Sequence, residues 1–354
     1  MTCTGKRVPM AKVHFLESHP TRNRILGIKR LIAESGVLSS LSRGDVVAVK
    51  FHPGELGNPY HVDSLTLRIV LDAIKERGGD PFLMDTTALY LCTRATGLGY
   101  YRTVNLQGFS LSTTGAPFIC GDGLGGSRGI LLKGKGIAEE ILMADILAEC
   151  QFLFVVSHCK GHRMTGFGGA VKNVGMGCVT RQTKLSLHRK VSSTFESGKC
   201  NGCGRCNEEC PWHFPQVVDG RMVNTSPFCM RCTICMDYCP EGAIALVGIE
   251  NLGKAIASSA CAVVERFGEK KAFLNVAMNI SAHCDCIEAP GRLVMGDIGY
   301  FASHDLVACD QAFLAGERAS VFQDLYGIDP RLHVSEAERL GGGTTDFELI
   351  RIEP

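Results

Sequence analysis

Residues 200–240 read CNGCGRCNEECPWHFPQVVDGRMVNTSPFCMRCTICMDYCP, a stretch in which one cysteine pattern occurs twice. The first copy contains Cys200, Cys203, Cys206 and Cys210, and the second contains Cys229, Cys232, Cys235 and Cys239. Each copy ends in Cys-Pro, which gives C-x2-C-x2-C-x3-C-P, the spacing that holds a [4Fe-4S] cluster. Three thiolates on one tight loop can converge on three irons of one cube, while the fourth cysteine leads away from that cube toward the other half. The stretch therefore predicts two [4Fe-4S] clusters.

The repeat resembles the bacterial-type ferredoxin domain with two clusters. That resemblance implies crossed ligation, with one cluster held by Cys200, Cys203, Cys206 and Cys239 and the other by Cys229, Cys232, Cys235 and Cys210. The alternatives are a pair of zinc sites, which also use C-x2-C units, or a disulfide scaffold. Two runs that each end in Cys-Pro favour clusters over both. Between the runs, Asp219-Gly220 predicts a hairpin turn.

The composition limits the class of protein. In 354 residues, 37 Lys and Arg balance 36 Asp and Glu, so no bulk charge points to nucleic acid or to a membrane surface. No apolar run is long enough to span a membrane, and the first residues lack a secretory signal. Ten of the 18 cysteines lie outside the repeat. These features predict a protein of a reducing, anaerobic cytoplasm, with most of the loose cysteines buried as thiols.

Apolar strands alternate with amphipathic helices on both sides of the repeat. Residues 45–51, 81–85, 151–157 and 271–278 predict strands, and residues 22–35, 63–77, 98–108, 136–149, 249–267 and 304–318 predict helices. Continuous apolar strands indicate a mostly parallel sheet with helices on both faces. We therefore expect an α/β domain in two parts, 1–194 and 248–354, interrupted by a small α+β ferredoxin-like insertion at 195–247.

Ligands of such sheets gather beyond the carboxyl ends of the strands, where Lys50, Asp85 and His158 stand. The glycine-rich stretch 158–178 follows one of these ends and predicts a loop whose N–H groups cradle an anion. His162, Lys172 and Asn173 are the candidate ligands for a small anionic substrate or cofactor. The loop has neither the Walker order nor G-x-G-x-x-G, and a tight loop that only packs a helix on the sheet explains the glycines as well.

Cys284 and Cys286 form a C-x-C pair just beyond another expected strand. With Cys178 they are candidates for a third metal or iron-sulfur site. The alternative is that they are only packed thiols. Nearby, Asp305 precedes an expected helix and reads as its N-terminal cap.

Several segments together resemble the iron-sulfur family called domain of unknown function 362. They are VAVKFHPGELGNPYHV, GGDPFLMDTTALY, SHCKGHRMTGFGGAVKNVGMGC and CDC…DIGYFASHDLVACD, spread over residues 45–315. The resemblance implies this domain organisation and an iron-sulfur or ferredoxin-like protein, without a defined reaction. The stretch around 162–177 is also similar to the cofactor-binding loop of lactate racemases, which implies an anionic ligand there.

The sequence thus predicts an iron-sulfur electron-transfer protein that relays single electrons to a redox partner protein or to a site in its α/β domain. One alternative is an oxidoreductase with a third cluster, another metal, or an anionic cofactor or substrate in that domain. A second alternative is a scaffold that senses redox state. These readings differ in what they require of the α/β domain, since a plain carrier has no use for a polar pocket.

Overall fold

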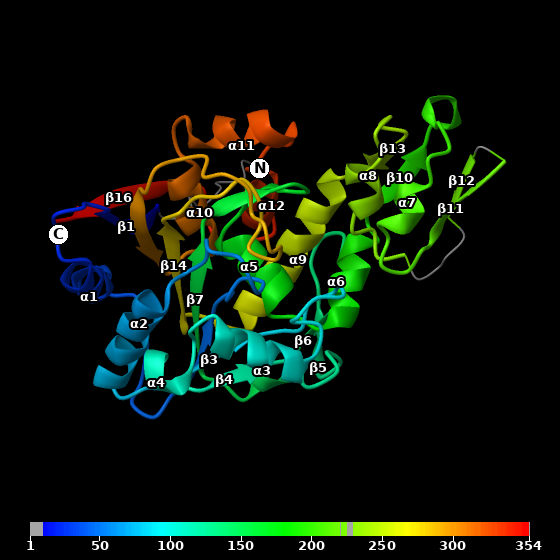
Figure 1. The fold of residues 1–354 in the computed structure, drawn as a ribbon. Helices are drawn as coiled ribbons and strands as arrows, with labels where there is room; N and C mark the ends of the chain where they lie inside the picture. The colour runs from blue at the N-terminus through cyan, green and yellow to red at the C-terminus, as the bar shows by residue number, and fades with distance from the viewer. Residues whose placement is uncertain (1–9, 220, 225–228, 354) are drawn as a thin grey trace, which may run out of the picture.

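The protein is built on an eight-stranded sheet (Figure 1), seen in a computed structural model that describes residues 10–219, 221–224 and 229–353. The strand order is β16-β1-β15-β14-β7-β2-β3-β4. Only β15 runs antiparallel to its neighbours, so the sheet is mostly parallel, as predicted. The strands are β1 (Ala11–Glu17), β2 (Val46–Lys50), β3 (Asp80–Asp85), β4 (Phe118–Cys120), β7 (Phe152–His158), β14 (Lys271–Ala277), β15 (Gly299–Ser303) and β16 (Phe347–Ile352).

Helices cover both faces of the sheet, because its central strands are apolar on both sides. In β7, Leu153 and Val155 pack into one core cluster, whereas Phe152, Phe154 and Val156 pack into the other. The first cluster is completed by α5 (Ala170–Gly177), α9 (Glu250–Phe267), α10 (Leu306–Leu314) and α12 (Leu332–Arg339), and the second by α1 (Arg24–Ser35), α2 (Ser64–Glu76) and α3 (Gly97–Leu106). The prediction of an α/β sheet buried between helices is confirmed.

Two of the expected helices differ from the structure. Residues 136–149 form a strand, β6 (Glu140–Ala144), and a short 3-10 turn, Asp145–Ala148. β6 pairs antiparallel with β5 (Gly129–Lys133), a hairpin that buries Ile141 and Met143. The helix expected at 304–318 ends at Leu314 and is followed by α11 (Arg318–Tyr326). Asp305 caps it as predicted, accepting bonds from the N–H groups of Val307 and Ala308 at 2.9 and 2.8 Å.

The remaining elements of the main body are α4 (Leu111–Thr114), the hairpin of β8 (Lys160–His162) and β9 (Gly166–Gly168), and α6 (Arg181–His188). The hairpin follows β7 directly along the chain, and α6 comes after it and α5. They therefore lie at the carboxyl edge of the sheet, where the sequence places its candidate ligands.

The cysteine-rich segment projects from one end of the main body (Figure 1). It begins with β10 (Ser192–Phe195) and ends with β13 (Ile244–Val247), which pair antiparallel. Between them lie a 3-10 turn (Ser197–Lys199), the single-turn helices α7 (Arg205–Glu208) and α8 (Ile234–Asp237), and the hairpin of β11 (Pro215–Val218) and β12 (Arg221–Asn224). That hairpin was expected, and Gly220 of its turn lies outside the described residues.

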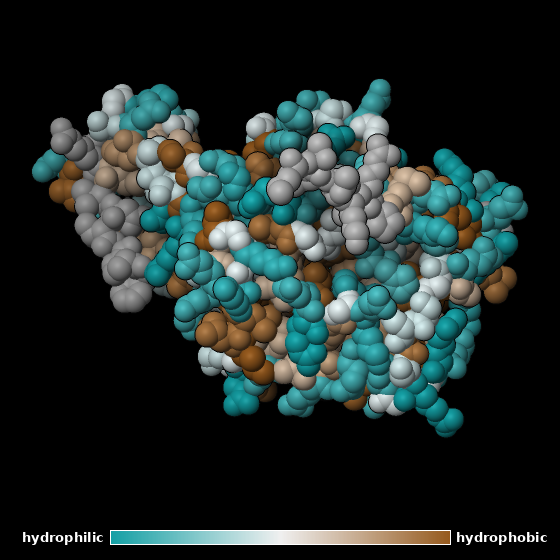
Figure 2. Space-filling view, turned by 180° about the vertical axis from the view of Figure 1, so that it is seen from behind, coloured by the Kyte–Doolittle hydropathy of each residue, from teal (hydrophilic) through white to brown (hydrophobic). Residues whose placement is uncertain are grey.

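A notch separates this segment from the main body in the view from behind (Figure 2). Hydrophilic residues cover much of that face, with hydrophobic ones scattered between them. In the part of the chain that is described, none of the helices has the length and apolarity needed to cross a membrane.

Candidate functional site

The structure brings the eight repeat cysteines together in two crossed sets. One cavity is lined by Cys200, Cys203 and Cys206 of the first run and by Cys239 of the second. A second cavity is lined by Cys229, Cys232 and Cys235 of the second run and by Cys210 of the first. These are the two sets that the ferredoxin resemblance implies.

The two cysteine loops share one backbone conformation, although their sequences differ. In the first, Gly202 and Gly204 have φ of 73° and 77°, and in the second the matching Arg231 and Thr233 have φ of 55° and 73°. The cysteine between each pair is not among the residues of positive φ. Alternation of this kind turns successive N–H groups toward one concave side, which makes an anion-binding nest. A β-branched residue such as Thr233 adopts positive φ only where its surroundings enforce it.

Electrostatic interactions between the thiols also link the members of the second set. Burial raises the pKa of Cys235 to about 12, and the neighbouring Cys232, Cys229 and Cys210 add to the rise. Four thiolates this close repel one another, a cost that bound cations remove. Backbone N–H groups also point at sulfur, with Gly202 N–H donating to Cys200 Sγ at 3.4 Å and Ala243 N–H to Cys239 Sγ at 3.3 Å. The residues present therefore fit a thiolate-bound cluster in each cavity.

Among the described residues, no group of three or more His, Cys, Asp or Glu side chains is placed to hold a metal ion. All the described cysteines are free thiols.

A third cavity lies in the main body at the carboxyl ends of β2 and β3. The three candidate anion ligands, His162, Lys172 and Asn173, all line it, and so does Cys286. Its cationic groups come from several elements and are Lys50, Arg94, Lys160, Lys172 and Lys184. The expected position of a ligand site beyond the strand ends therefore coincides with a real cavity.

Asn173 has a structural part in that cavity. Its Oδ1 accepts from Lys50 Nζ at 2.5 Å, and its Nδ2 donates to Val156 O and Ser157 Oγ. Lys50 also pairs with Asp85 at 3.1 Å, and both side chains are almost fully buried. Gly177 leaves room for this lysine, because a Cβ there would lie 2.3 Å from Lys50 Nζ. Asn173 thus holds a buried lysine in place instead of presenting a free amide.

Two of the lysines carry charge that no carboxylate pairs. Lys50, Lys160 and Arg94 pair with Asp85, Asp285 and Glu55. In the described part of the chain, Lys172 and Lys184 form no such ion pair; Lys172 Nζ donates to Cys284 Sγ at 3.0 Å, and Lys184 Nζ donates to Thr86 Oγ1 at 2.7 Å. Burial lowers the pKa of Lys184, which Asp122 and Asp85 oppose. Lys172 faces the Cys284 sulfur, so a ligand with one negative charge would balance the remaining cation, Lys184.

The glycine-rich loop differs from the expectation in one respect. Its N–H groups at Ala170 and Val171 donate to the carboxylate of Asp310, at 2.6 and 2.9 Å. Asn275 Nδ2 donates to the same carboxylate at 2.7 Å. The anion at the start of α5 is therefore an internal side chain, and these two N–H groups are not free to bind a ligand.

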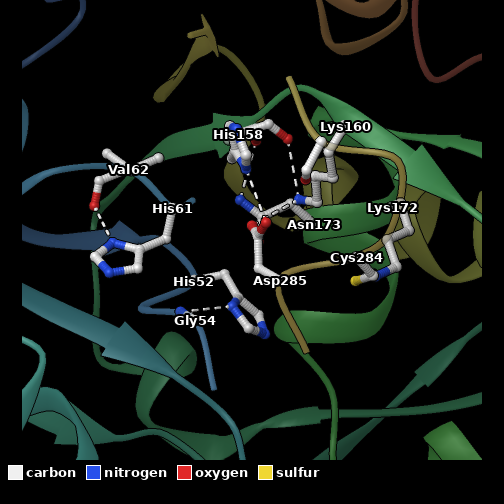
Figure 3. Close-up of polar contacts among 12 residues, drawn as sticks. His52, Gly54, His61, Val62, His158, Lys160, Lys172, Asn173, Cys284 and Asp285 are labelled. Carbon is white, nitrogen blue, oxygen red and sulfur yellow. Dashed lines mark hydrogen bonds and ion pairs between the residues drawn. The ribbon is translucent and has the colours of Figure 1, made fainter. Parts of the chain in front are cut away.

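The C-x-C pair lies beside the cavity on a turn closed by Ile287 N–H donating to Cys284 O. Figure 3 shows Lys172 reaching Cys284, with Asp285 directed toward His158 and Lys160. Those two contacts measure 2.8 and 3.2 Å and lower the pKa of Asp285 in spite of its burial. The middle residue of the pair therefore anchors the turn.

The two thiols of the pair have opposite characters. The neighbouring Cys286 lowers the pKa of Cys284 well below its usual value; burial opposes this fall, and Lys172 and Lys160 add to it. Cys284 in turn raises the pKa of Cys286. Cys178, the third member expected, packs in the core cluster and is not among the residues that line the cavity.

The second cysteine cavity adjoins the main-body cavity. Arg163, next to His162, donates from Nη2 to Cys232 O at 3.0 Å and pairs with Asp237 of α8. His188 lines the main-body cavity and contacts the backbone of Arg231. Tyr90, hydrogen-bonded to His188 at 3.2 Å, has a pKa raised by burial and then by Cys286 and Cys232 together. Tyr90 therefore lies within electrostatic reach of both the C-x-C pair and the second cysteine set.

Tyr90, Arg94 and Lys184 are cavity residues that were not predicted from the sequence. Tyr90 and Arg94 follow β3 in a loop without a recognisable motif, so no spacing marks them. Lys184 carries one signal, because it precedes His188 by four residues on α6, and residues at that spacing share a helix face.

Comparison with known proteins gives a family but no activity. The profile of a family described as "Domain of unknown function (DUF362)" matches residues 47–315. No curated protein matches the chain. The solved structures that match the chain include two at low identity. One is the lactate racemase apoprotein from Thermoanaerobacterium thermosaccharolyticum, at 14% identity and a TM-score of 0.45, with 85% of this chain and 56% of that one covered.

The other is a Thermotoga maritima protein from a structural genomics programme, at 11% identity and a TM-score of 0.44, with coverage of 92% and 61%. The chain thus spans less than two thirds of the length of either structure.

Proposed function

Because this chain belongs to the family described as domain of unknown function (DUF362), a description that states no activity, we propose its function from its own residues. The protein is an iron-sulfur electron-transfer protein that carries two [4Fe-4S] clusters and relays single electrons to a partner protein or to its own main-body cavity. When bound, each cluster carries one electron at a potential set by its ligands, burial and hydrogen bonds.

The observation that carries the proposal is the crossed grouping of the cysteines. Each cavity takes three cysteines from one run and the fourth from the other, Cys239 in the first case and Cys210 in the second. The pair of nests and the N–H donors at Cys200 and Cys239 add to this support. These residues would hold the clusters and direct N–H dipoles at their sulfurs, which favours the reduced, more negative state.

The test is the content of iron and acid-labile sulfide in anaerobically purified protein, with EPR of the reduced sample. We expect about eight irons per chain, four for each cluster. Zinc in place of iron, or no metal after anaerobic reconstitution, would refute the proposal.

Double substitution tests the crossed ligand sets. If Cys203 and Cys239 hold the same cluster, Cys203→Ser/Cys239→Ser loses no more iron than either single variant, about four atoms. If Cys239 instead serves the cluster of the Cys229 loop, the double variant loses all eight. Cys150→Ser is the matched control, because Cys150 is buried in the core, where its thiol only donates to Ile146 O at 3.3 Å. This control keeps the full iron content.

A second candidate function is reduction or oxidation of a small anionic substrate in the main-body cavity. It is favoured by the two cations without a carboxylate partner, Lys172 and Lys184, in a cavity that adjoins the second cysteine set. In this role Lys184 binds the anion, and the neutral His162, whose pKa burial and Lys172 lower, is placed to accept a proton.

Thermal shifts test this candidate with acetate, oxalate and inorganic phosphate as probes. A ligand at a hundred times its Kd adds about 2.7 kcal/mol of stability. We expect at least one probe to raise the melting temperature of the protein and Lys184→Gln to abolish the rise. Lys133→Gln, on the exposed surface of β5, keeps it. Equal shifts in both variants would refute an anion site at Lys184.

A further inference from the structure

The Cys284–Cys286 pair has the features of a redox centre of its own. The two residues stand on one turn, and Cys284 Sγ accepts from Lys172 Nζ at 3.0 Å. Two packed thiols in the described part of the chain differ: Cys150 and Cys261 donate to backbone carbonyls, and no lysine there donates a hydrogen bond to either sulfur. A thiolate beside a fixed cation and a second thiol is the environment of reactive dithiols.

We propose that Cys284 and Cys286 form a reversible dithiol–disulfide couple that stores two electrons at the wall of the main-body cavity. On reduction, the Sγ–Sγ bond breaks and two electrons pass to the sulfurs. One proton goes to Cys286 Sγ, while Cys284 stays a thiolate opposite the Lys172 ammonium. The electrons come from one-electron iron-sulfur carriers; this supply rests on the proposed function, whereas the couple itself does not.

The two cysteines of the couple stand on a fixed turn. The turn from Cys284 to Ile287 holds them two residues apart on one loop, and Asp285, held by His158 and Lys160, fixes the position of that loop. A disulfide requires its two Cα atoms within about 4.4–6.8 Å, so a turn that keeps its two cysteines together favours the bond.

The pair is also asymmetric in the way that exchange requires. Cys284 is 6% exposed, whereas Cys286 lines the cavity and is partly exposed. An incoming electron donor or thiol therefore meets the sulfur of Cys286 first. Cys284 is the sulfur released, and a leaving thiolate beside Lys172 is the favourable one, because a thiol of lower pKa leaves faster.

The location of the pair connects it to the second cysteine set. Tyr90 is within electrostatic reach of both Cys286 and Cys232, and Arg163 joins the backbone of Cys232 to the strand that carries His162. Two carriers of one electron each match the two electrons that one disulfide accepts. The couple would thus let a one-electron relay perform two-electron chemistry.

One tryptic peptide makes the test direct. Cleavage after Lys271 and Arg292 releases residues 272–292, whose only cysteines are Cys284 and Cys286. The anaerobic protein is equilibrated in redox buffers of dithiothreitol and then glutathione, quenched in acid, and alkylated with iodoacetamide after denaturation. We expect this peptide to change between two alkyl groups and none as the potential rises. Two alkyl groups at every potential would overturn the proposal.

The pH dependence tests the retained thiolate. A two-electron couple shifts by about 30 mV for each tenfold change in K, so one proton taken up gives about 30 mV per pH unit and two protons give about 59 mV. We expect about 30 mV between pH 7 and pH 8 for the protein and for Lys172→Arg, and about 59 mV for Lys172→Gln. Lys135→Gln, which removes an ion pair with Glu265 on the surface, is the control and keeps the slope of the unaltered protein.

Iron analysis separates the two proposals. Cys284→Ser should keep the iron content of the unaltered protein, while a loss of iron would mean that the pair ligates a metal and would overturn the couple. Conversely, a peptide that stays fully alkylated leaves the count of about eight irons untouched. The peptide and the iron count can therefore fail independently.

Discussion

Replacing Lys50 by Met should destabilise the main body more than any single substitution on its surface. The Lys50 side chain is fully buried, and Asp85 beside it is 3% exposed. Lys50→Met has a similar shape but leaves the Asp85 carboxylate with only Tyr100 Oη and the Thr86 N–H as donors, at 2.6 and 2.8 Å. Breaking a buried pair by removing one partner costs about 3–5 kcal/mol. That is a large share of the roughly 5–15 kcal/mol that stabilise a typical domain.

The assay is urea unfolding at pH 7 followed by far-UV circular dichroism. Tryptophan fluorescence would report the wrong region, because the single tryptophan, Trp212, lies in the cysteine-rich segment. Arg24→Met is the matched control. It removes a charge from an ion pair of equal length, 3.1 Å to Asp63, whose side chains are 38% and 41% exposed. A surface pair of this kind contributes about 0–1 kcal/mol.

Adding a second substitution identifies the cause of the loss. In Lys50→Met/Asp85→Asn the uncompensated charge is gone, so we expect the double variant to be more stable than the sum of the two single losses. If Lys50→Met costs no more than Arg24→Met, or if the two losses simply add, the burial argument for this cavity is wrong.

Three further outcomes follow from the fold. Gly177→Ala should lower the free energy of unfolding by about 1–3 kcal/mol through overpacking, because the added Cβ would meet Lys50 Nζ. The control is Gly125→Ala, whose Cβ would have no atom within 4 Å, so this variant should keep the melting temperature of the unaltered protein. Asp305→Ala should cost about 1–2 kcal/mol through loss of the α10 cap, seen as a lower urea midpoint; an unchanged midpoint would contradict the capping role.

His333 is buried beside Phe167, and burial lowers its pKa to about 3, so it is neutral in the folded state. In the unfolded chain it takes up a proton below about pH 6.5. The free energy of unfolding therefore falls by about 1.4 kcal/mol for each pH unit below that value. His333→Phe should therefore lose about 2 kcal/mol less than the unaltered protein between pH 7 and pH 5, and equal losses would show that His333 is not the group responsible.

The parts of the fold that follow from local pattern are predictable from the sequence. The apolar runs of β2 and β7 indicate strands buried on both faces, and their carboxyl ends locate Lys50 and His158 at the cavity edge. The prediction of a helix over 136–149 is wrong because local helix preference is only part of the free energy of folding. Glu140–Ala144 contains good helix formers, yet pairing with Gly129–Lys133 buries Ile141 and Met143.

The candidate site is less predictable because its members come together only through tertiary structure. The glycine-rich loop indicated an anion, and the anion at its helix start is Asp310, about 140 residues further along the chain. Likewise Lys172 meets Cys284 across 112 residues. A single sequence contains no signal for pairs so far apart along the chain. The spacing of the repeat cysteines is local to one loop, so it can be recognised from the sequence.

The stem formed by β10 and β13 has a consequence for protein engineering. Ser192 pairs with Val247 and Phe195 with Ile244, so the chain leaves the main body and returns to it on adjacent strands, about 5 Å apart. A two-residue turn could bridge Phe195 and Ile244, and a different small domain could be grafted onto the same stem. The graft would keep the stem but lose the contacts of Arg163 with Cys232 O and Asp237, which lie beyond it. Attachment to the main body and contact with its cavity wall thus depend on separate parts of this segment.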